Sequence, residues 1–201
     1  PLATVRHTLD AQGRTQHIQR ISHRNGQAQS PQPIERHEYA DSRWPDKPTL
    51  IARPSVVAGQ EHRLQLGYNE AGQVTELKES GFSPLDTSGA LAGSPQQATP
   101  IERITRYTHT RINGVSLLTQ VDGPLPNGPS STPADSDITT FEWDQRGRFL
   151  QRITHPLGLQ EQLVHDMQGL NPSGRLLSRI GINGVTTFLQ WSPMGQLVQL
   201  E

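Results

Sequence analysis

The eight histidines are the side chains of this sequence best suited to hold a metal ion or move a proton. Zinc sites built on histidine place two of them four residues apart on a helix, or gather them in a compact cluster. Neither spacing occurs here, and His37-Glu38 lacks the second histidine of a zinc-protease helix. We therefore predict no metal site, and we interpret all eight as strand-surface or turn residues: His7, His17, His23, His37, His62, His109, His155 and His165.

Residues for covalent or acid–base catalysis are also poorly placed. Gly81-Phe82-Ser83-Pro84 lacks the second glycine of a nucleophile elbow. The chain has no cysteine, which removes thiol nucleophiles, disulfides and thiolate ligands. A glycosidase-type carboxylate pair stays open, because the 19 acidic residues could meet anywhere in the fold. We predict no enzyme activity, no catalytic residue and no cofactor.

The three tryptophans and the many arginines suggest binding chemistry. Trp143 and Trp191 both precede a turn motif, where an aromatic packs on the next hairpin, whereas Trp44 is less constrained and could stack on a sugar. Sixteen arginines stand against two lysines, and they are scattered along the chain. Because arginine makes planar bidentate pairs with carboxylates, we favour cross-strand pairing over anion binding.

The composition limits the elements that could position these residues. Of 201 residues only 32% are hydrophobic, below the ~45–50% usual for globular domains. The net charge of −1 argues against simple disorder and against nucleic-acid binding. No stretch approaches the ~18–20 apolar residues that span a membrane. The sequence starts at Pro1, so we expect a piece of a longer protein whose apolar residues form a thin, regular layer.

Alternating apolar and polar residues predict strands. Residues 64–68, 139–143 and 185–191 place Leu, Val, Phe, Tyr, Trp or Thr on every second position. Asn-Gly pairs, which favour two-residue type I′ hairpin turns, occur four times. They are Asn25-Gly26, Asn113-Gly114, Asn127-Gly128 and Asn183-Gly184.

Three Pro-rich stretches interrupt this pattern. Residues 83–100 and 123–137 are rich in Pro, Gly and Ser and are predicted to be loop insertions. Residues 31–54 carry Tyr39 and Trp44, so we expect them to be ordered and to pack irregularly across neighbouring strands.

One six-residue pattern recurs and is called the corner motif below: a large apolar residue, then Asp, Asn or Ser, two free positions, Gly, and Arg or Gln. Its polar second residue accepts backbone hydrogen bonds, and its glycine adopts the left-handed conformation that closes a hairpin with a bulge. The copies are Leu9-Asp10-Ala11-Gln12-Gly13-Arg14, Tyr68-Asn69-Glu70-Ala71-Gly72-Gln73, Trp143-Asp144-Gln145-Arg146-Gly147-Arg148 and Trp191-Ser192-Pro193-Met194-Gly195-Gln196. A degenerate copy, His165-Asp166-Met167-Gln168-Gly169-Leu170, is followed by a second glycine, Gly174, which we interpret as one corner with about five inserted residues.

These residues resemble the Rhs/YD-repeat family. Besides the corner motifs, the segment Thr154-His155-Pro156-Leu157-Gly158 is similar to the family's Asp-Pro-Leu-Gly turn, with His in place of Asp. The runs Gly174-Arg175-Leu176-Leu177-Ser178-Arg179 and Tyr39-Ala40-Asp41 are also typical of it. The resemblance covers most of the chain, and the departures from the family's pattern are Ser192 for Asp, Leu9 for Tyr and the two long insertions.

The resemblance implies an all-β fold of repeated antiparallel β-hairpins, forming part of a spiral YD-repeat sheet. Residues 1–201 would be one segment of the shell that such proteins build. In bacterial polymorphic toxins that shell encloses a variable C-terminal toxin, and in animal teneurins a similar shell lies on the cell surface. The auto-cleavage motif of bacterial cores is only begun at His155 and its acid is missing, so no catalytic residue carries over.

The expected function is then a non-enzymatic wall for a toxin of interbacterial competition, secreted or in the cell envelope. Its partners would be the remaining shell repeats and the C-terminal toxin domain. Edge strands would also let an isolated piece self-associate. The alternative is a cell-surface module that binds carbohydrate or protein through Trp44 and the long loops.

Overall fold

The chain folds as one antiparallel β-sheet. The computed structural model describes residues 3–83, 98–125, 137–167 and 173–201. Neighbours along the chain are neighbours in the sheet, in the order β1-β2-β4-β5-β6-β7-β8-β9-β10-β11-β12-β13-β14-β15, with β3 beside β2. The prediction of an all-β, hairpin-built fold is confirmed. The strands are β1 Ala3–Leu9, β2 Thr15–Arg24, β3 Gln27–Ala28, β4 Gln32–Glu38, β5 Leu50–Pro54, β6 Glu61–Tyr68, β7 Val74–Phe82, β8 Pro100–Ile112, β9 Val115–Asp122, β10 Ile138–Trp143, β11 Leu150–Thr154, β12 Gln160–His165, β13 Leu176–Ile180, β14 Thr186–Trp191 and β15 Leu197–Leu200.

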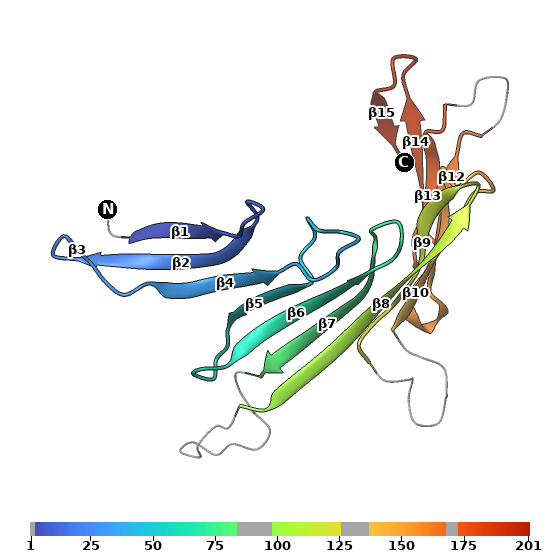
Figure 1. Cartoon of the computed structure of the whole chain (residues 1–201). Coiled ribbons are helices and arrows are strands. Elements are labelled where there is room, and N and C mark those ends of the chain that lie inside the picture. The colour runs from blue at the N-terminus through green and yellow to red at the C-terminus, as the bar shows by residue number, and fades with distance from the viewer. Residues whose placement is uncertain (1–2, 84–97, 126–136, 168–172) are drawn as a thin grey trace, which may run out of the picture. The chain divides into compact units, whose positions relative to one another are not determined.

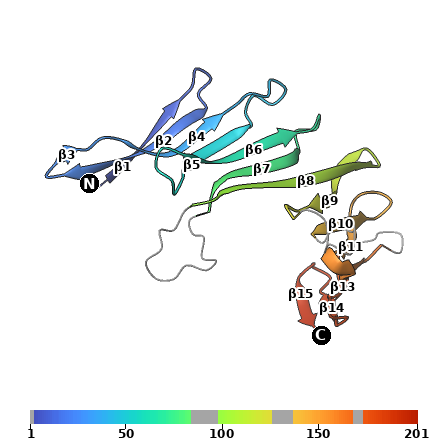
Figure 2. The same cartoon turned by 90° about the horizontal axis from the view of Figure 1, so that it is seen from below.

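The chain divides into two compact units, Pro1–Thr105 and Arg106–Glu201, and the boundary falls within β8. In the first unit, β1 to β7 follow one another side by side, from blue to green in Figure 1. Figure 2 shows these strands as a single layer. In the second unit, β9 to β15 follow the same hairpin order.

Turns alternate between the two ends of the strands, as an antiparallel meander requires. All motif corners fall at the same end of the strands within each unit, called the corner edge below. Gly13 and Gly72 lie there in the first unit, and Gly147, Gly174 and Gly195 in the second. The other edge carries the turns around Gly59, Gly158 and Gly184.

The Asn-Gly pairs do not all form the same turn. Asn25-Gly26 and Asn113-Gly114 have positive φ at both residues, as a type I′ turn requires. Asn183 is not left-handed, so the prediction of a type I′ turn there is wrong. Five residues separate the paired Ile180 and Thr186, and this longer loop closes with the backbone hydrogen bonds of a corner instead. Asn127-Gly128 lies outside the described residues.

The Pro-rich stretches turn out differently from one another. Within residues 31–54, both ends are regular strands, β4 and β5, and only residues 39–49 are irregular. The predicted insertions 83–100 and 123–137 lie mostly outside the described residues. The last residue of the first stretch, Pro100, is described and begins β8. No helix in the described residues is long and apolar enough to cross a membrane.

Very little of the sheet is buried. Among the described residues, only Leu50 and Ala52 are buried apolar side chains. Ala52 is 2% exposed and lies in β5, beside an ion pair that runs from Arg36 in β4 to Glu61 in β6. Arg36 is the register partner of Ala52, so the pair crosses β5 on the face that carries this alanine. A small side chain at position 52 is therefore a requirement of the ion pair above it.

Ala52→Leu should destabilise the first unit by about 1–3 kcal/mol, since the larger side chain displaces the Arg36–Glu61 pair. Ala28→Leu is the control, because Ala28 is exposed in β3 and its substitution should stay within about 0.5 kcal/mol. Urea unfolding gives both free energies of unfolding. Equal losses in the two variants would contradict the packing described for Ala52.

Candidate functional site

The motif corners share one backbone geometry. In the corner at Asp10, its N–H donates to the Arg14 carbonyl at 2.9 Å, and the Gly13 N–H donates back to the Asp10 carbonyl at 3.0 Å. The corners at Asn69 and Ser192 repeat this pair of bonds at 2.8–3.0 Å. Each corner is thus a closed hairpin end whose glycine has a φ between 66° and 84°.

The polar second residue of the motif caps the turn with its side chain. Asp10 Oδ1 accepts the N–H groups of Gln12 and Arg14, both at 2.9 Å. Asn69 Oδ1 accepts the equivalent N–H groups of the next corner at 2.9 and 3.0 Å. At Ser192 the shorter side chain accepts only the N–H of Gln196, at 3.1 Å. The motif therefore needs an oxygen acceptor here rather than a charge.

The corner at Asp144 is one residue longer than the sequence predicts. Asp144 N–H donates to the Phe149 carbonyl, and β11 begins at Leu150, three residues after Gly147, whereas β7 and β15 each begin two residues after their corner glycine. The Asp144 carboxylate is 5% exposed and accepts the N–H groups of Arg148 and Phe149 at 2.5 and 2.9 Å. Burial alone would raise the pKa of Asp144, but these hydrogen bonds and the charge of Arg148 outweigh it and hold that pKa below its usual value.

The degenerate corner closes on Gly174. The Gly174 N–H donates to the Asp166 carbonyl at 2.9 Å, and Asp166 N–H donates to the Arg175 carbonyl at 2.8 Å. Asp166 Oδ2 also accepts the hydroxyl of Ser173 at 2.7 Å. The second glycine thus occupies the place that the motif gives to its glycine. Gly169 lies outside the described residues.

Successive turns at the corner edge stack on one another. A Cβ built on Gly72 would lie 3.0 Å from the Trp44 ring, and one on Gly147 would lie 2.9 Å from Leu117. Gly195 is covered in the same way by Arg175 at 3.0 Å. The Phe149 ring lies against Gly174. In each of these pairs the covering side chain comes from the turn, or the strand ends, just before the corner along the chain.

Cationic side chains also join successive turns by donating hydrogen bonds to backbone carbonyls. Arg175 Nη1 donates to the Ser192 carbonyl at 3.0 Å, and Lys47 Nζ donates to the Gly72 carbonyl. Arg14 donates to the Pro45 carbonyl, and its guanidinium lies 4.3 Å from the centre of the Tyr39 ring. Arg14 and Arg175, each the first residue after a corner glycine, therefore bind the backbone of the next turn.

All three tryptophans use the indole N–H in the same way. Trp44 donates to the Asn69 carbonyl at 2.9 Å, Trp143 to Leu118 at 2.9 Å and Trp191 to Leu176 at 2.7 Å. The Trp44 ring covers Gly72, so this residue is as much part of a corner as the other two. Sequence reasoning missed this role. No sequence pattern indicated it, because the contact joins residues far apart in the chain: the bonds of Trp44, Lys47 and Trp143 each span 25 residues.

The faces of the sheet carry paired charges. Glu161 Oε1 lies 2.9 Å from His155 Nε2, and its Oε2 accepts Arg179 Nε at 2.8 Å. The hydrogen bonds from Arg179 and His155 hold the pKa of Glu161 below its usual value, against the effect of burial.

The same combination of one carboxylate, one histidine and one arginine recurs in the first unit. Glu35 contacts His37 and Arg53, and Glu79 contacts His62 and Arg103. The predicted pairing of arginines is thus seen in the structure. Among the described residues, no three His, Cys, Asp or Glu side chains gather as metal ligands would.

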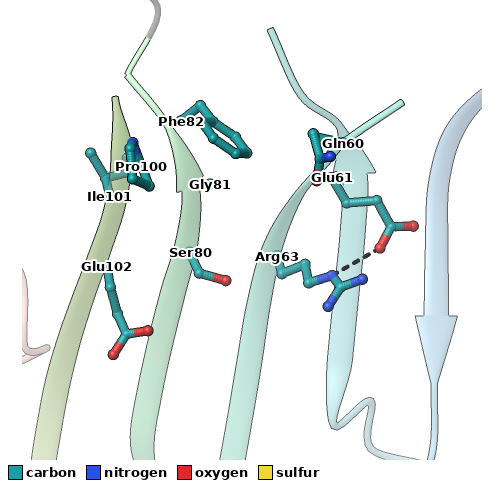
Figure 3. A pocket seen from close by; sticks show the side chains of 9 residues that line it. All are labelled: Gln60, Glu61, Arg63, Ser80, Gly81, Phe82, Pro100, Ile101 and Glu102. Carbon is teal, nitrogen blue, oxygen red and sulfur yellow. Dashed lines mark hydrogen bonds and ion pairs between the residues drawn. The ribbon is translucent and has the colours of Figure 1, made fainter. Parts of the chain in front are cut away.

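A hollow of about 370 Å³ lies over β6, β7 and the start of β8. Figure 3 shows Arg63 turned toward Glu61 at its rim, with Phe82 above. The two acids of the hollow are both engaged: Glu61 binds Arg36 and Arg63, and Glu102 binds Lys78 at 2.9 Å. The hollow therefore contains ion-paired carboxylates.

Comparison with known proteins supports the fold. No model of a known protein family matches the sequence, and no curated protein matches it. The solved structure described as TcdB2-TccC3-Cdc42 matches 98% of this chain with a TM-score of 0.58 at 13% identity. TcdB2-TccC3 without its hypervariable C-terminal region matches 98% with a TM-score of 0.60 at 14% identity. This chain spans 9% of the length of either of those chains, and what it shares with them is the fold.

Gly72→Ala should destabilise the first unit more than Gly13→Ala does. Both glycines are left-handed, which costs a side chain about 1–2 kcal/mol. Only Gly72 is also covered, by Trp44 and Lys47, so overpacking adds about 1–3 kcal/mol there. Urea unfolding measures the difference, and equal losses would show that the stacking contributes nothing.

Asp144→Ala should lower the free energy of unfolding by about 1–3 kcal/mol, because it leaves the part-buried N–H groups of Arg148 and Phe149 without their acceptor. Asp144→Asn keeps the Oδ1 acceptor, as Asn69 does, and should cost less. The native pKa of Asp144 is lowered, so its ionic contribution is complete above the unfolded value of about 3.9 and is lost as the pH falls through the native value. Between pH 7 and pH 3 the wild type should therefore lose more stability than Asp144→Asn, and identical losses would contradict the assigned role.

Proposed function

We propose that this chain is a section of the wall of an Rhs/YD-type shell, which encloses a toxin carried by the same protein. The observation that carries the proposal is the single-layered sheet whose corners stack in order. Such a sheet can extend by adding hairpins without adding a core, which is what a curved wall requires. The corner motifs and the shared fold with toxin-complex structures support this proposal.

The charges on the sheet suit a wall with water on both sides. In β5, Ala52 and Arg53 face opposite sides, because successive strand residues alternate. The side of Arg53 carries Glu35 and His37, and the side of Ala52 carries Arg36, Glu61 and Arg63. Because both faces hold paired charges, neither is suited to dry packing against a second layer.

The proposed partners are the remaining repeats of the shell and a C-terminal toxin domain. One of the two structural neighbours was solved without its hypervariable C-terminal region, and a region of that kind is the cargo that the proposal requires. We place the protein among secreted or envelope toxins of interbacterial competition. In this scheme the wall itself is not an enzyme, and any catalysis belongs to the enclosed domain.

Arg53 and Arg63 offer a matched pair of sites for testing the proposal. They lie on neighbouring strands, their side chains are 53% and 51% exposed, and each binds a glutamate, yet they face opposite sides of the sheet. The chain has no cysteine of its own, so Arg53→Cys or Arg63→Cys introduces a single thiol into it. A bulky polymer-linked maleimide cannot enter a closed shell.

In the complete protein that carries this segment, one of the two cysteines should react with the bulky reagent at least tenfold more slowly than the other. A small maleimide should label both, and in the isolated 201-residue chain both should react alike with either reagent. Equal rates with the bulky reagent in the complete protein would show that neither face is enclosed, and the proposal would fail.

A further inference from the structure

The two outermost strands of the sheet are β1 and β15. Within the described residues, nothing pairs with the outer side of either strand. Phe188 and Glu201 exchange both backbone hydrogen bonds, at 2.7 and 3.1 Å, so the N–H and C=O of Glu201 point inward, toward β14. The N–H and C=O of the neighbouring Leu200 therefore point outward, to the free side of the sheet.

The same alternation sets the outward residues of β1. Its corner has the same bond as the last corner, from Asp10 N–H to the Arg14 carbonyl, so Arg6 corresponds to Phe188. Arg6 then points its backbone inward toward Gln19, and Val5 and His7 point theirs outward.

Neither edge strand contains a lysine or a proline, although β15 is only four residues long and the register shift beside Trp191 leaves Val198 as a bulge. β15 reads Leu-Val-Gln-Leu, with no charge and no proline, and Val198 and Leu200 are 63% and 60% exposed. On β1, Val5 and Leu9 are 59% and 54% exposed. Natural edge strands are commonly blunted by lysine, proline or a bulge on the free side. The exposed apolar side chains and the absence of lysine and proline leave both edges able to accept another strand, in β15 over the residues beyond the bulge.

The topology makes the two edges complementary. Fourteen strands follow one another on the main path of the sheet, each antiparallel to the last, so β1 and β15 have opposite directions in that alternation. A β1 strand of a second copy added beside β15 would thus continue the antiparallel alternation. Because β1 ends at the corner of Gly13, this addition would also keep all corners at the corner edge.

The first corner has an open place for such a neighbour. Gly72, Gly147, Gly174 and Gly195 are each covered by a side chain from the preceding turn or strand ends. Gly13 alone among the corner glycines has no atom of the described residues within 4 Å of a built Cβ. The last corner of another copy, with Gln196 in the position that Arg175 has one corner earlier, would precede Gly13 in the stack.

We propose that β15 of one chain pairs with β1 of a second copy, so that the isolated chain associates head to tail. The contact is heterologous, because it uses two different surfaces, so copies add one after another until they close into a ring or continue as a filament. Association can therefore continue beyond a dimer.

Two edge variants test the proposal. Val5→Pro and Leu200→Pro each remove an outward N–H and leave the inward ladder intact. Val5→Lys and Leu200→Lys are second variants that keep every N–H and oppose pairing with a charge. Circular dichroism and tryptophan fluorescence establish that each variant keeps the fold.

Sedimentation velocity of the wild type should show the mean size rising with concentration beyond a dimer. Each edge variant alone should stay monomeric. An equimolar mixture of a β1 variant and a β15 variant should form a dimer and nothing larger, because only one intact pair of edges is present.

Three results would overturn the proposal. A wild type that is monomeric at all concentrations excludes the contact. A β1 variant that still associates alone shows a β15–β15 contact, and a β15 variant that does so shows a β1–β1 contact. None of these results depends on the cysteine labelling of the complete protein, so this proposal and the shell proposal can fail separately.

Discussion

The packing of four of the five corner glycines under side chains from the preceding turn or strand ends is the contact on which this fold depends. A single-layered sheet has almost no core, and among the described residues only Leu50 and Ala52 are buried apolar side chains. Backbone ladders join strands but leave the ends of hairpins open to fraying. Trp44, Leu117, Phe149 and Arg175 lock those ends together, because a left-handed glycine leaves room where any other residue would carry a Cβ.

Ion pairs on the faces take over part of the role that apolar burial has in two-layered folds. The Arg36–Glu61 pair joins β4 to β6 across β5, and the contacts of Glu161 join β12, β13 and the turn before β12. An exposed pair of this kind is worth little alone, yet a network shared by several strands restrains their spacing. It also keeps both faces polar, as the proposed role in a shell wall requires.

Local turn chemistry explains how much could be predicted. Asp10, Asn69 and Ser192 cap their own corners, so each six-residue motif was enough to predict its hairpin turn. Predictions failed where loop length decided the outcome. Asn183-Gly184 resembles Asn113-Gly114 in sequence, but its strands pair five residues apart rather than two, and the longer loop selects another turn. The extra residue at Phe149 has the same origin, in the register of β10 with β11.

The sequence by itself determined the strands, the corners and the order of the hairpins, since alternation and turn propensity act over a few neighbouring residues. Only the tertiary structure decided which turn covers which corner. Trp44 belongs to no corner motif in the sequence, yet its ring covers Gly72. Phe149 also belongs to no motif, yet it covers Gly174. These contacts join residues about 25 positions apart, and their partners are set by strand register, which no local pattern encodes.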